Sequence, residues 1–322
     1  MRVVRALLGP LMLIVNVCMA AAHAEEWPNR YVKIVVPYGA GGISDVLGRI
    51  TADKLSTTFG QRFIVETRAG ANGAIGTADA VRSPADGYTP YEAGGGQFSV
   101  LPLIQKLPYN PLTELDPVSM LAVNGMALVV NRDLPVRTLQ EFIEYVRAHP
   151  DTVYYGSVGR GSSGDLVPAA FAAKTGLKLT NVPYPAAPPA IMALKSGVVH
   201  MFFGNISDVI ASIQSGEVRL LAVSTAARLP QYPDVPTVSE VVPGFVMTAW
   251  NGYFAPAGTP RPIVNRLSEA LARICRDPDV VSLMSRLGLD PVGGTPEELR
   301  AAIQADLPIY RAAVEAAGLM SR

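Results

Sequence analysis

The sequence predicts a mixed α/β protein built from two lobes, each a β-sheet flanked by helices. Both halves of the chain open with the same pattern: an apolar run, a glycine-rich turn, a helix and a second apolar run. This alternation is typical of sheets covered by helices. The 322 residues are enough for about two domains. With 49% apolar and 17% charged residues, the composition is that of a globular protein.

The first of the two patterns lies near the N-terminus. A strand is expected over residues 32–36 (VKIVV), where β-branched side chains precede a proline. The glycine-rich turn follows, and a helix is expected over residues 46–57 with Ser44 or Asp45 as its cap. A second strand is expected over residues 63–67 (FIVET).

The second pattern begins in the middle of the chain. A strand over residues 153–157 leads into a turn with three glycines, and a helix is expected over residues 165–174. Gly176 closes this helix as a C′ residue, and the next strand is expected over residues 179–183. The C-terminal region is more helical, because Thr295-Pro296-Glu297-Glu298 is a capping box that starts a long last helix.

Residues 1–24 are interpreted as a cleavable signal peptide. Arg2 and Arg5 precede an uncharged stretch over residues 6–22, and Ala22-His23-Ala24 supplies a cleavage site. An uncleaved membrane anchor and a lipoprotein site at Cys18 are the alternatives. Cleavage leaves Cys275 as the only cysteine, and its apolar neighbours at helical spacing predict a buried structural thiol.

The charge balance and the residue counts exclude several classes of function. Lys+Arg and Asp+Glu both number 27, which argues against nucleic acid or an anionic membrane as a partner. Three histidines and two cysteines nearly exclude a His/Cys zinc site, and no metal or cofactor is expected. No motif for a nucleophile or a metalloprotease is present, so the chain is not expected to be an enzyme.

The glycine-rich turns allow three interpretations. Gly159, Gly161 and Gly164 match the spacing of a dinucleotide fingerprint, which would make the protein a nicotinamide-dependent enzyme. The glycines could instead only form tight turns. We favour a third interpretation, in which N–H groups at two helix N-termini bind an anionic ligand that the glycines allow to approach closely.

Taken in order, the motifs of the chain resemble those of the Bug family, the extracytoplasmic receptors of tripartite tricarboxylate transporters. The series starts with Trp27-Pro28 and VVPYGAGGISD and ends with PVGGTP. The matching segments are residues 27–28, 35–45, 60–61, 66–73, 86–89, 107–111, 155–157, 161–164, 182–184, 233–237, 254–260 and 291–296.

The resemblance implies a two-lobe periplasmic binding protein that closes on its ligand like a Venus flytrap. Residues 25–123 would form the first part of lobe 1, residues 124–247 lobe 2, and residues 248–322 the rest of lobe 1. The family's ligand, usually a carboxylic acid, lies between the two glycine loops. A periplasmic monomer that delivers a small molecule to membrane permease subunits is therefore expected. A receptor that signals to a membrane sensor is an alternative.

The candidate ligand-binding residues come from both lobes. Glycines offer close backbone approach, serines offer hydroxyls, and tyrosines form walls. The set is Tyr38, Gly39, Ala40, Gly41, Gly42, Ser44, Asp45, Gly95, Ser157, Gly161, Ser162, Ser163, Gly164, Asp165, Tyr184 and Asn205.

Several positions depart from the family pattern. Asp165 stands where the family often has histidine, and Pro185-Ala186-Ala187 replaces a cation and two glycines. Gly204 stands where the family has an acid, and residues 90–97 replace a strand that is usually apolar. Because the charge of Asp165 would repel a second carboxylate, we expect a ligand with one carboxylate at most, or an amide-like compound.

Overall fold

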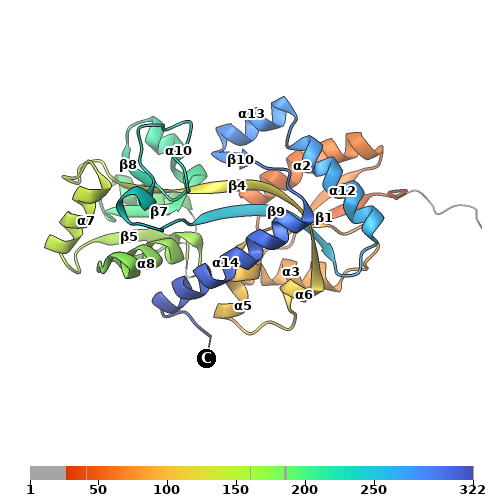
Figure 1. Cartoon of the computed structure of the whole chain (residues 1–322), viewed down its shortest axis with the longest axis horizontal. Helices are drawn as coiled ribbons and strands as arrows, with labels where there is room; N and C mark the ends of the chain where they lie inside the picture. The colour runs from red at the N-terminus through yellow and green to blue at the C-terminus, as the bar shows by residue number, and fades with distance from the viewer. Residues whose placement is uncertain (1–26, 41, 160, 185–186, 322) are drawn as a thin grey trace, which may run out of the picture.

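The computed structural model describes residues 27–40, 42–159, 161–184 and 187–321. The expected signal peptide, Cys18, Gly41, Pro185 and Ala186 lie outside these residues. Figure 1 shows two lobes side by side, joined by the long strands β4 and β9 and crossed by the helix α14. The predicted two-lobe α/β fold is confirmed.

The strands of the described chain are short in each lobe and long where the lobes join. They are β1 (Val32–Val36), β2 (Phe63–Thr67), β3 (Tyr91–Gly94), β4 (Leu115–Asn131), β5 (Tyr154–Ser157), β6 (Thr180–Pro183), β7 (Met201–Asn205), β8 (Val218–Val223), β9 (Thr248–Pro256) and β10 (Leu289–Pro291).

Helices separate most of the strands along the chain. They are α2 (Ile43–Phe59), the 3₁₀ turn η1 (Ala71–Gly73), α3 (Ala74–Arg82), α4 (Gly96–Ser99), α5 (Leu101–Ile104), α6 (Pro111–Glu114), α7 (Leu139–Ala148), α8 (Ser163–Thr175), α9 (Ala187–Lys195), α10 (Ile206–Gln214), α11 (Val238–Val241), α12 (Arg261–Ile274), α13 (Pro278–Arg286) and α14 (Pro296–Ala316).

Both glycine-loop units form as parallel βαβ structures. Strands β1 and β2 occupy the predicted residues and pair in parallel. Strands β5 and β6 also pair in parallel, and each begins one residue later than predicted. The predicted cap of the first helix is wrong. Helix α2 begins at Ile43 with Gly42 as its N-cap residue, so Ser44 and Asp45 lie inside its first turn. The extended backbone of Gly42 starts the helix earlier than the side-chain signals indicated.

One sheet runs through both lobes. Its order is β2-β1-β3-β9-β4-β7-β5-β6, and β4 also pairs with β10 and β8. Along β4, residues 115–125 pair with β9 of the first lobe, whereas residues 126–131 pair with β7 and β8 of the second. The pairing partners of β4 thus change near Gly125, and β9 begins at Thr248.

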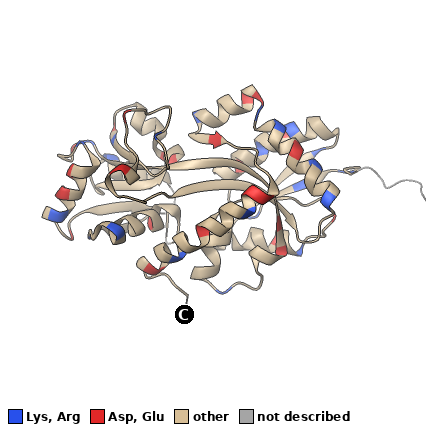
Figure 2. Ribbon diagram, viewed as in Figure 1, with Lys and Arg blue, Asp and Glu red and all other residues tan. Residues whose placement is uncertain are grey.

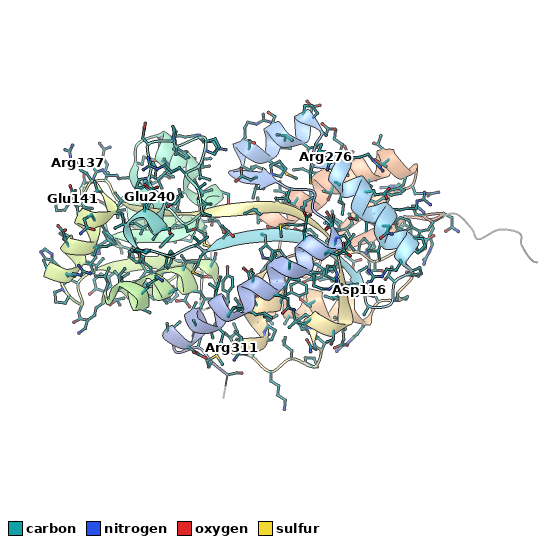
Figure 3. The ribbon with its side chains drawn as sticks, in the orientation of Figure 1. Asp116, Arg137, Glu141, Glu240, Arg276 and Arg311 are labelled. Atoms are coloured by element: carbon teal, nitrogen blue, oxygen red, sulfur yellow. The ribbon has the colours of Figure 1, made fainter. Side chains whose placement is uncertain are left out.

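The last helix packs against the cores of both lobes. Its first half packs Leu299 and Ile303 into the first lobe's core, while Tyr310 and Val314 join the core of the second lobe. Figure 3 labels Arg311 on this second half. Its capping box forms as predicted, since the Glu298 amide donates to the Thr295 hydroxyl at 3.2 Å and the Thr295 amide donates to the Glu298 carboxylate at 2.7 Å.

The distribution of charged residues and the burial of Cys275 agree with the sequence-based expectations. Figure 2 shows acidic and basic residues mixed over both lobes. No helix within the described ranges is long and apolar enough to cross a membrane. The prediction for Cys275 is confirmed: its thiol is buried against the Leu121 carbonyl at 3.3 Å, and burial raises its pKa to about 11.

Candidate ligand-binding site

The first glycine loop connects β1 to α2 and faces solvent. Tyr38, Gly39, Ala40 and Gly42 are exposed, although the strand before them is buried. A Cβ atom built at Gly39 would meet nothing within 4 Å, so the backbone here is open to approach. The N–H groups in the first turn of α2 have no helical carbonyl to bond and carry the positive end of the helix dipole. The loop can therefore hold an anion.

Buried polar side chains support this loop from below. Asp45 is 3% exposed and forms an ion pair with Arg49 one turn along α2, with Nη2 and Oδ1 at 3.0 Å. The Ser44 hydroxyl is also buried and accepts a hydrogen bond from the Asn251 amide at 3.1 Å. Both side chains thus fasten the first turn of α2, and its N–H groups remain directed at the loop.

The second glycine loop connects β5 to α8 and requires glycine at two positions. Gly159 has φ of 104° and Gly161 has φ of 77°, a region that other residues rarely adopt. The Ser162 hydroxyl donates to the Gly159 carbonyl at 2.7 Å and closes the turn. Helix α8 then starts at Ser163, so the first-turn N–H groups of Ser163 and Gly164 form a second anion-binding end.

Asp165 holds the second loop in shape. Its carboxylate is 5% exposed and accepts from the Gly161 N–H at 2.8 Å, the Asn181 amide at 2.5 Å and the Tyr155 hydroxyl at 3.3 Å. Asp165, Asn181 and Tyr155 all line a hollow of about 800 Å³ between α8, β6 and the end of α14. The Asp165 carboxylate is therefore hydrogen-bonded by donors of its own lobe.

The two lobes face each other across a groove of about 400 Å³. Asn72, Ile104 and Gln105 line it from the first lobe and Gly161 from the second. The first glycine loop is tied to this groove through Gln97, whose amide donates to the Tyr38 hydroxyl at 2.6 Å and to the Asn72 carbonyl at 3.3 Å. The second loop thus lines the groove directly, and the first loop is connected to it through Gln97.

The remaining candidate residues of the second lobe lie at the ends of its strands. The Tyr184 amide donates to the Ser157 carbonyl at 2.9 Å, which places Tyr184 beside the start of the second loop. Asn205 ends β7 and precedes α10. The Ser157 hydroxyl and the side-chain Oδ1 of Asn205 are buried and have no hydrogen-bond partner within the described ranges. Such atoms are rare in native structures and are candidates for a ligand.

Gly95 is packed against Trp250. A Cβ atom at Gly95 would lie 2.9 Å from the indole ring, and the Gly95 N–H donates to the Trp250 carbonyl at 3.2 Å. The indole is 3% exposed and stacks near Phe98 and Phe254, so Trp250 belongs to the core.

Substituting Gly95 with alanine should therefore displace Trp250. We expect the free energy of unfolding to fall by about 1–3 kcal/mol, because the site is already closely packed. A methyl group added at the neighbouring Gly96 would meet nothing within 4 Å, so Gly96→Ala should change the free energy of unfolding by less than about 0.5 kcal/mol. Urea denaturation followed by tryptophan fluorescence measures both. Equal effects of the two substitutions would contradict this packing.

Glu92 is a buried carboxyl directly beneath the first loop. It is 0% exposed, and its Oε1 accepts from the Asn251 amide at 2.8 Å. Burial raises the pKa of Glu92 to about 8, although hydrogen bonds with Asn251 and Ser44 oppose this shift. The folded protein therefore holds a proton that the unfolded chain, with a glutamate pKa near 4.3, releases.

This shift predicts a pH-dependent stability. Because the folded-state pKa is raised, the contribution of Glu92 is full below about pH 4 and is lost as the pH rises through about 8. We expect the melting temperature to fall between about pH 6 and 9, and Glu92→Gln to flatten that fall because an amide does not titrate. Differential scanning calorimetry across this range is the measurement. Parallel curves for the two proteins would refute the assignment.

Several residues of this site escaped the sequence reasoning. Asn72 and Ile104 line the groove, Gln97 ties it to the first loop, and Asn251 holds Glu92. Of these residues, only Glu92 could have been identified from the sequence, because it is an acid in a segment whose pattern indicates a buried strand. Asn251 and Gln97 lie in no motif, and their roles depend on partners far away in the chain.

Comparisons with known proteins agree with this geometry. Residues 47–319 match the model of the tripartite tricarboxylate transporter family receptor. Among curated proteins, the protein BugT of Bordetella pertussis is 32% identical over 317 residues, covering 96% of this chain and 97% of BugT. The expected resemblance to the Bug family is confirmed.

Two solved structures with bound ligands share the fold. Rpa4515 of R. palustris with adipate superposes with a TM-score of 0.82 at 33% identity, covering 91% of this chain and 99% of that one. MatC of Rhodopseudomonas palustris with bound malate gives a TM-score of 0.78 at 30% identity, covering 89% and 100%. Both neighbours bind a small carboxylate.

Proposed function

We propose, on the premise that this chain belongs to the tripartite tricarboxylate transporter receptor family, that it captures a small organic acid between its lobes in the periplasm. The ligand's carboxylate binds the N–H groups at the starts of α2 and α8. Membrane permease subunits of a tripartite transporter then receive the ligand. Export follows from the signal peptide predicted over residues 1–24.

One observation supports this proposal above the others: the second glycine loop lines a groove between the lobes, and Gln97 links the first glycine loop to the same groove. Each loop leads into a helix N-terminus with a buried aspartate in its first turn: Asp45 in α2, paired with Arg49, and Asp165 in α8, which holds its loop through the Gly161 N–H. Helix N-termini favour anions, and paired loops across a hinge allow two-sided capture. The long strands β4 and β9 supply the connection about which the lobes would move.

A thermal-shift screen of the purified protein tests the function. It covers mono-, di- and tricarboxylates, their amides, and NAD. Ligand at 100 times its dissociation constant adds about 2.7 kcal/mol to the free energy of unfolding, which raises the melting temperature by several degrees. Stabilisation by NAD alone would contradict the proposal and favour a nucleotide-dependent enzyme.

X-ray scattering tests the closing motion. The radius of gyration should decrease when the stabilising ligand is added, since capture brings the lobes together. An unchanged radius with a ligand that raises the melting temperature would refute closure. Mass spectrometry of the denatured protein checks whether a ligand from the host already fills the site, which would make the starting state closed.

A further inference from the structure

The C-terminal segment, residues 317–321, reaches the groove between the lobes. Two of its residues line the groove together with residues of both lobes, and the set is Asn72, Ile104, Gln105, Gly161, Gly318 and Leu319. The last residues of the chain therefore form part of the groove wall, although they are far in sequence from both glycine loops.

A tight turn at the end of α14 fixes the position of Leu319. Gly318 follows the helix with φ of 65°, a conformation that favours glycine. The Gly318 N–H donates to the Glu315 carbonyl at 3.0 Å, and the Leu319 N–H donates to the Val314 carbonyl at 3.0 Å. These are the two hydrogen bonds of a Schellman motif, so the direction of the chain after the helix is set by its own backbone.

The C-terminal segment is attached to both lobes. Leu319 packs against the core of the second lobe, to which Val314 belongs. The Ser321 N–H donates to the Leu103 carbonyl of α5, in the first lobe, at 2.8 Å. Leu103 directly precedes Ile104, so this hydrogen bond holds the end of the chain beside the first-lobe wall of the groove.

The groove is lined by aliphatic and uncharged polar residues. Leu319 and Ile104 supply its aliphatic side chains, and its described lining contains no Lys, Arg, Asp or Glu. A Cβ atom at Gly161 would lie 2.8 Å from Ile104 Cδ1, so Ile104 reaches the second glycine loop. Such a wall suits the uncharged body of a ligand, whose carboxylate is left to the N–H groups at the helix N-termini.

We propose that the C-terminal segment determines ligand specificity, in that Leu319 and Ile104 bind the hydrocarbon body of the ligand. The hydrogen bond between Ser321 and Leu103 keeps Leu319 in place. Because the glycine loops bind the ligand's carboxylate, this inference rests on the proposed function and specifies the ligand as an organic acid with an aliphatic chain. Burial of each CH₂ group strengthens binding by about fourfold at most, so the affinity should rise with chain length.

Two homologous series of acids measure this dependence by isothermal titration calorimetry. One series is butanoate, pentanoate and hexanoate, and the other is succinate, glutarate and adipate. In at least one series, each added CH₂ group should lower the dissociation constant of the wild-type protein about twofold or more. An affinity that does not rise with chain length in either series would overturn the proposed contact with the ligand's body.

Leu319→Ser assigns the dependence to this side chain. The six-carbon acid should bind about threefold or more weakly, whereas the four-carbon acid should change by less than about twofold. Met320→Ser is the matched control, because Met320 is the next residue, is 37% exposed and is not among the residues that line the groove. The control should alter none of the affinities, and equal effects of the two substitutions would overturn the assignment to Leu319.

Ser321→Pro tests the attachment of the segment to the first lobe. Proline has no N–H group, so the hydrogen bond to the Leu103 carbonyl is lost, and the six-carbon acid should lose affinity as it does in Leu319→Ser. Ser321→Ala keeps the N–H group and should bind each acid as the wild-type protein does. Equal affinities of the proline and alanine variants would overturn the role of this attachment.

The outcomes separate this inference from the proposed function. Binding of the acids with a dependence on chain length that Leu319→Ser leaves unchanged would overturn the inference and leave the receptor function intact. Failure of all six acids to bind would also overturn the inference, and the thermal-shift screen then decides whether the proposed function fails with it. Circular dichroism of the variants confirms that they are folded before affinities are compared.

Discussion

Gly161→Val is expected to weaken ligand binding by about a hundredfold or more while the protein stays folded. The added Cβ would lie 2.8 Å from Ile104 Cδ1 across the groove. At φ of 77° a β-branched residue is also a severe conformational outlier. The loop must therefore shift, and the hydrogen bond from its N–H to Asp165 would be lost with it.

Gly176→Val is the matched control for this substitution. Gly176 sits at the opposite end of the same helix with φ of 68°, and a Cβ there would meet nothing within 4 Å. Both substitutions should lower the free energy of unfolding by roughly 1–2 kcal/mol or more through the left-handed backbone. Only Gly161→Val should change the dissociation constant. Unchanged affinity in that variant would remove the second loop from the site.

Asp165→Ala should weaken both the fold and the binding. It leaves the Gly161 N–H and the Asn181 amide without their acceptor, so we expect the free energy of unfolding to fall by about 2–4 kcal/mol. The freed loop should raise the dissociation constant for every ligand by about tenfold, because its N–H groups are no longer held in place. Denaturant unfolding and calorimetric titration measure the two effects.

This result would decide between two roles for Asp165. If its charge repelled a second carboxylate, removing it would tighten the binding of dicarboxylates. If it positions the loop, removal weakens all ligands alike, which its three local donors favour. Tyr155→Phe removes only the longest of these hydrogen bonds, at 3.3 Å, and should cost about 0.5–1.5 kcal/mol. A tighter complex with adipate in Asp165→Ala would overturn the positioning role.

Local signals were sufficient for the elements that carry the glycine loops. The strand over residues 32–36 follows from five residues before a proline, four of which are β-branched and apolar. The start of α14 follows from a threonine and a glutamate three residues apart, which bond each other wherever the chain turns into a helix. The order of the motifs along the chain then indicated the family, and with it the use of both loops.

Other features depend on residues that are distant in the sequence. Glu92 and Asn251 are 159 residues apart and meet only because β3 pairs with β9. Helix α14 contributes apolar residues to the cores of both lobes. Its contact with the second lobe depends on where β4 and β9 place that lobe.

The sequence by itself determined the α/β pattern, the two glycine loops and the receptor family. The tertiary structure alone decided that Asp165 fastens its loop and that Glu92 is buried with Asn251 beneath the other loop. The physical reason is the distance along the chain over which each interaction acts. Backbone propensity and capping act over a few residues, whereas burial and hydrogen-bond satisfaction are set only when the packed strands and helices bring distant side chains together.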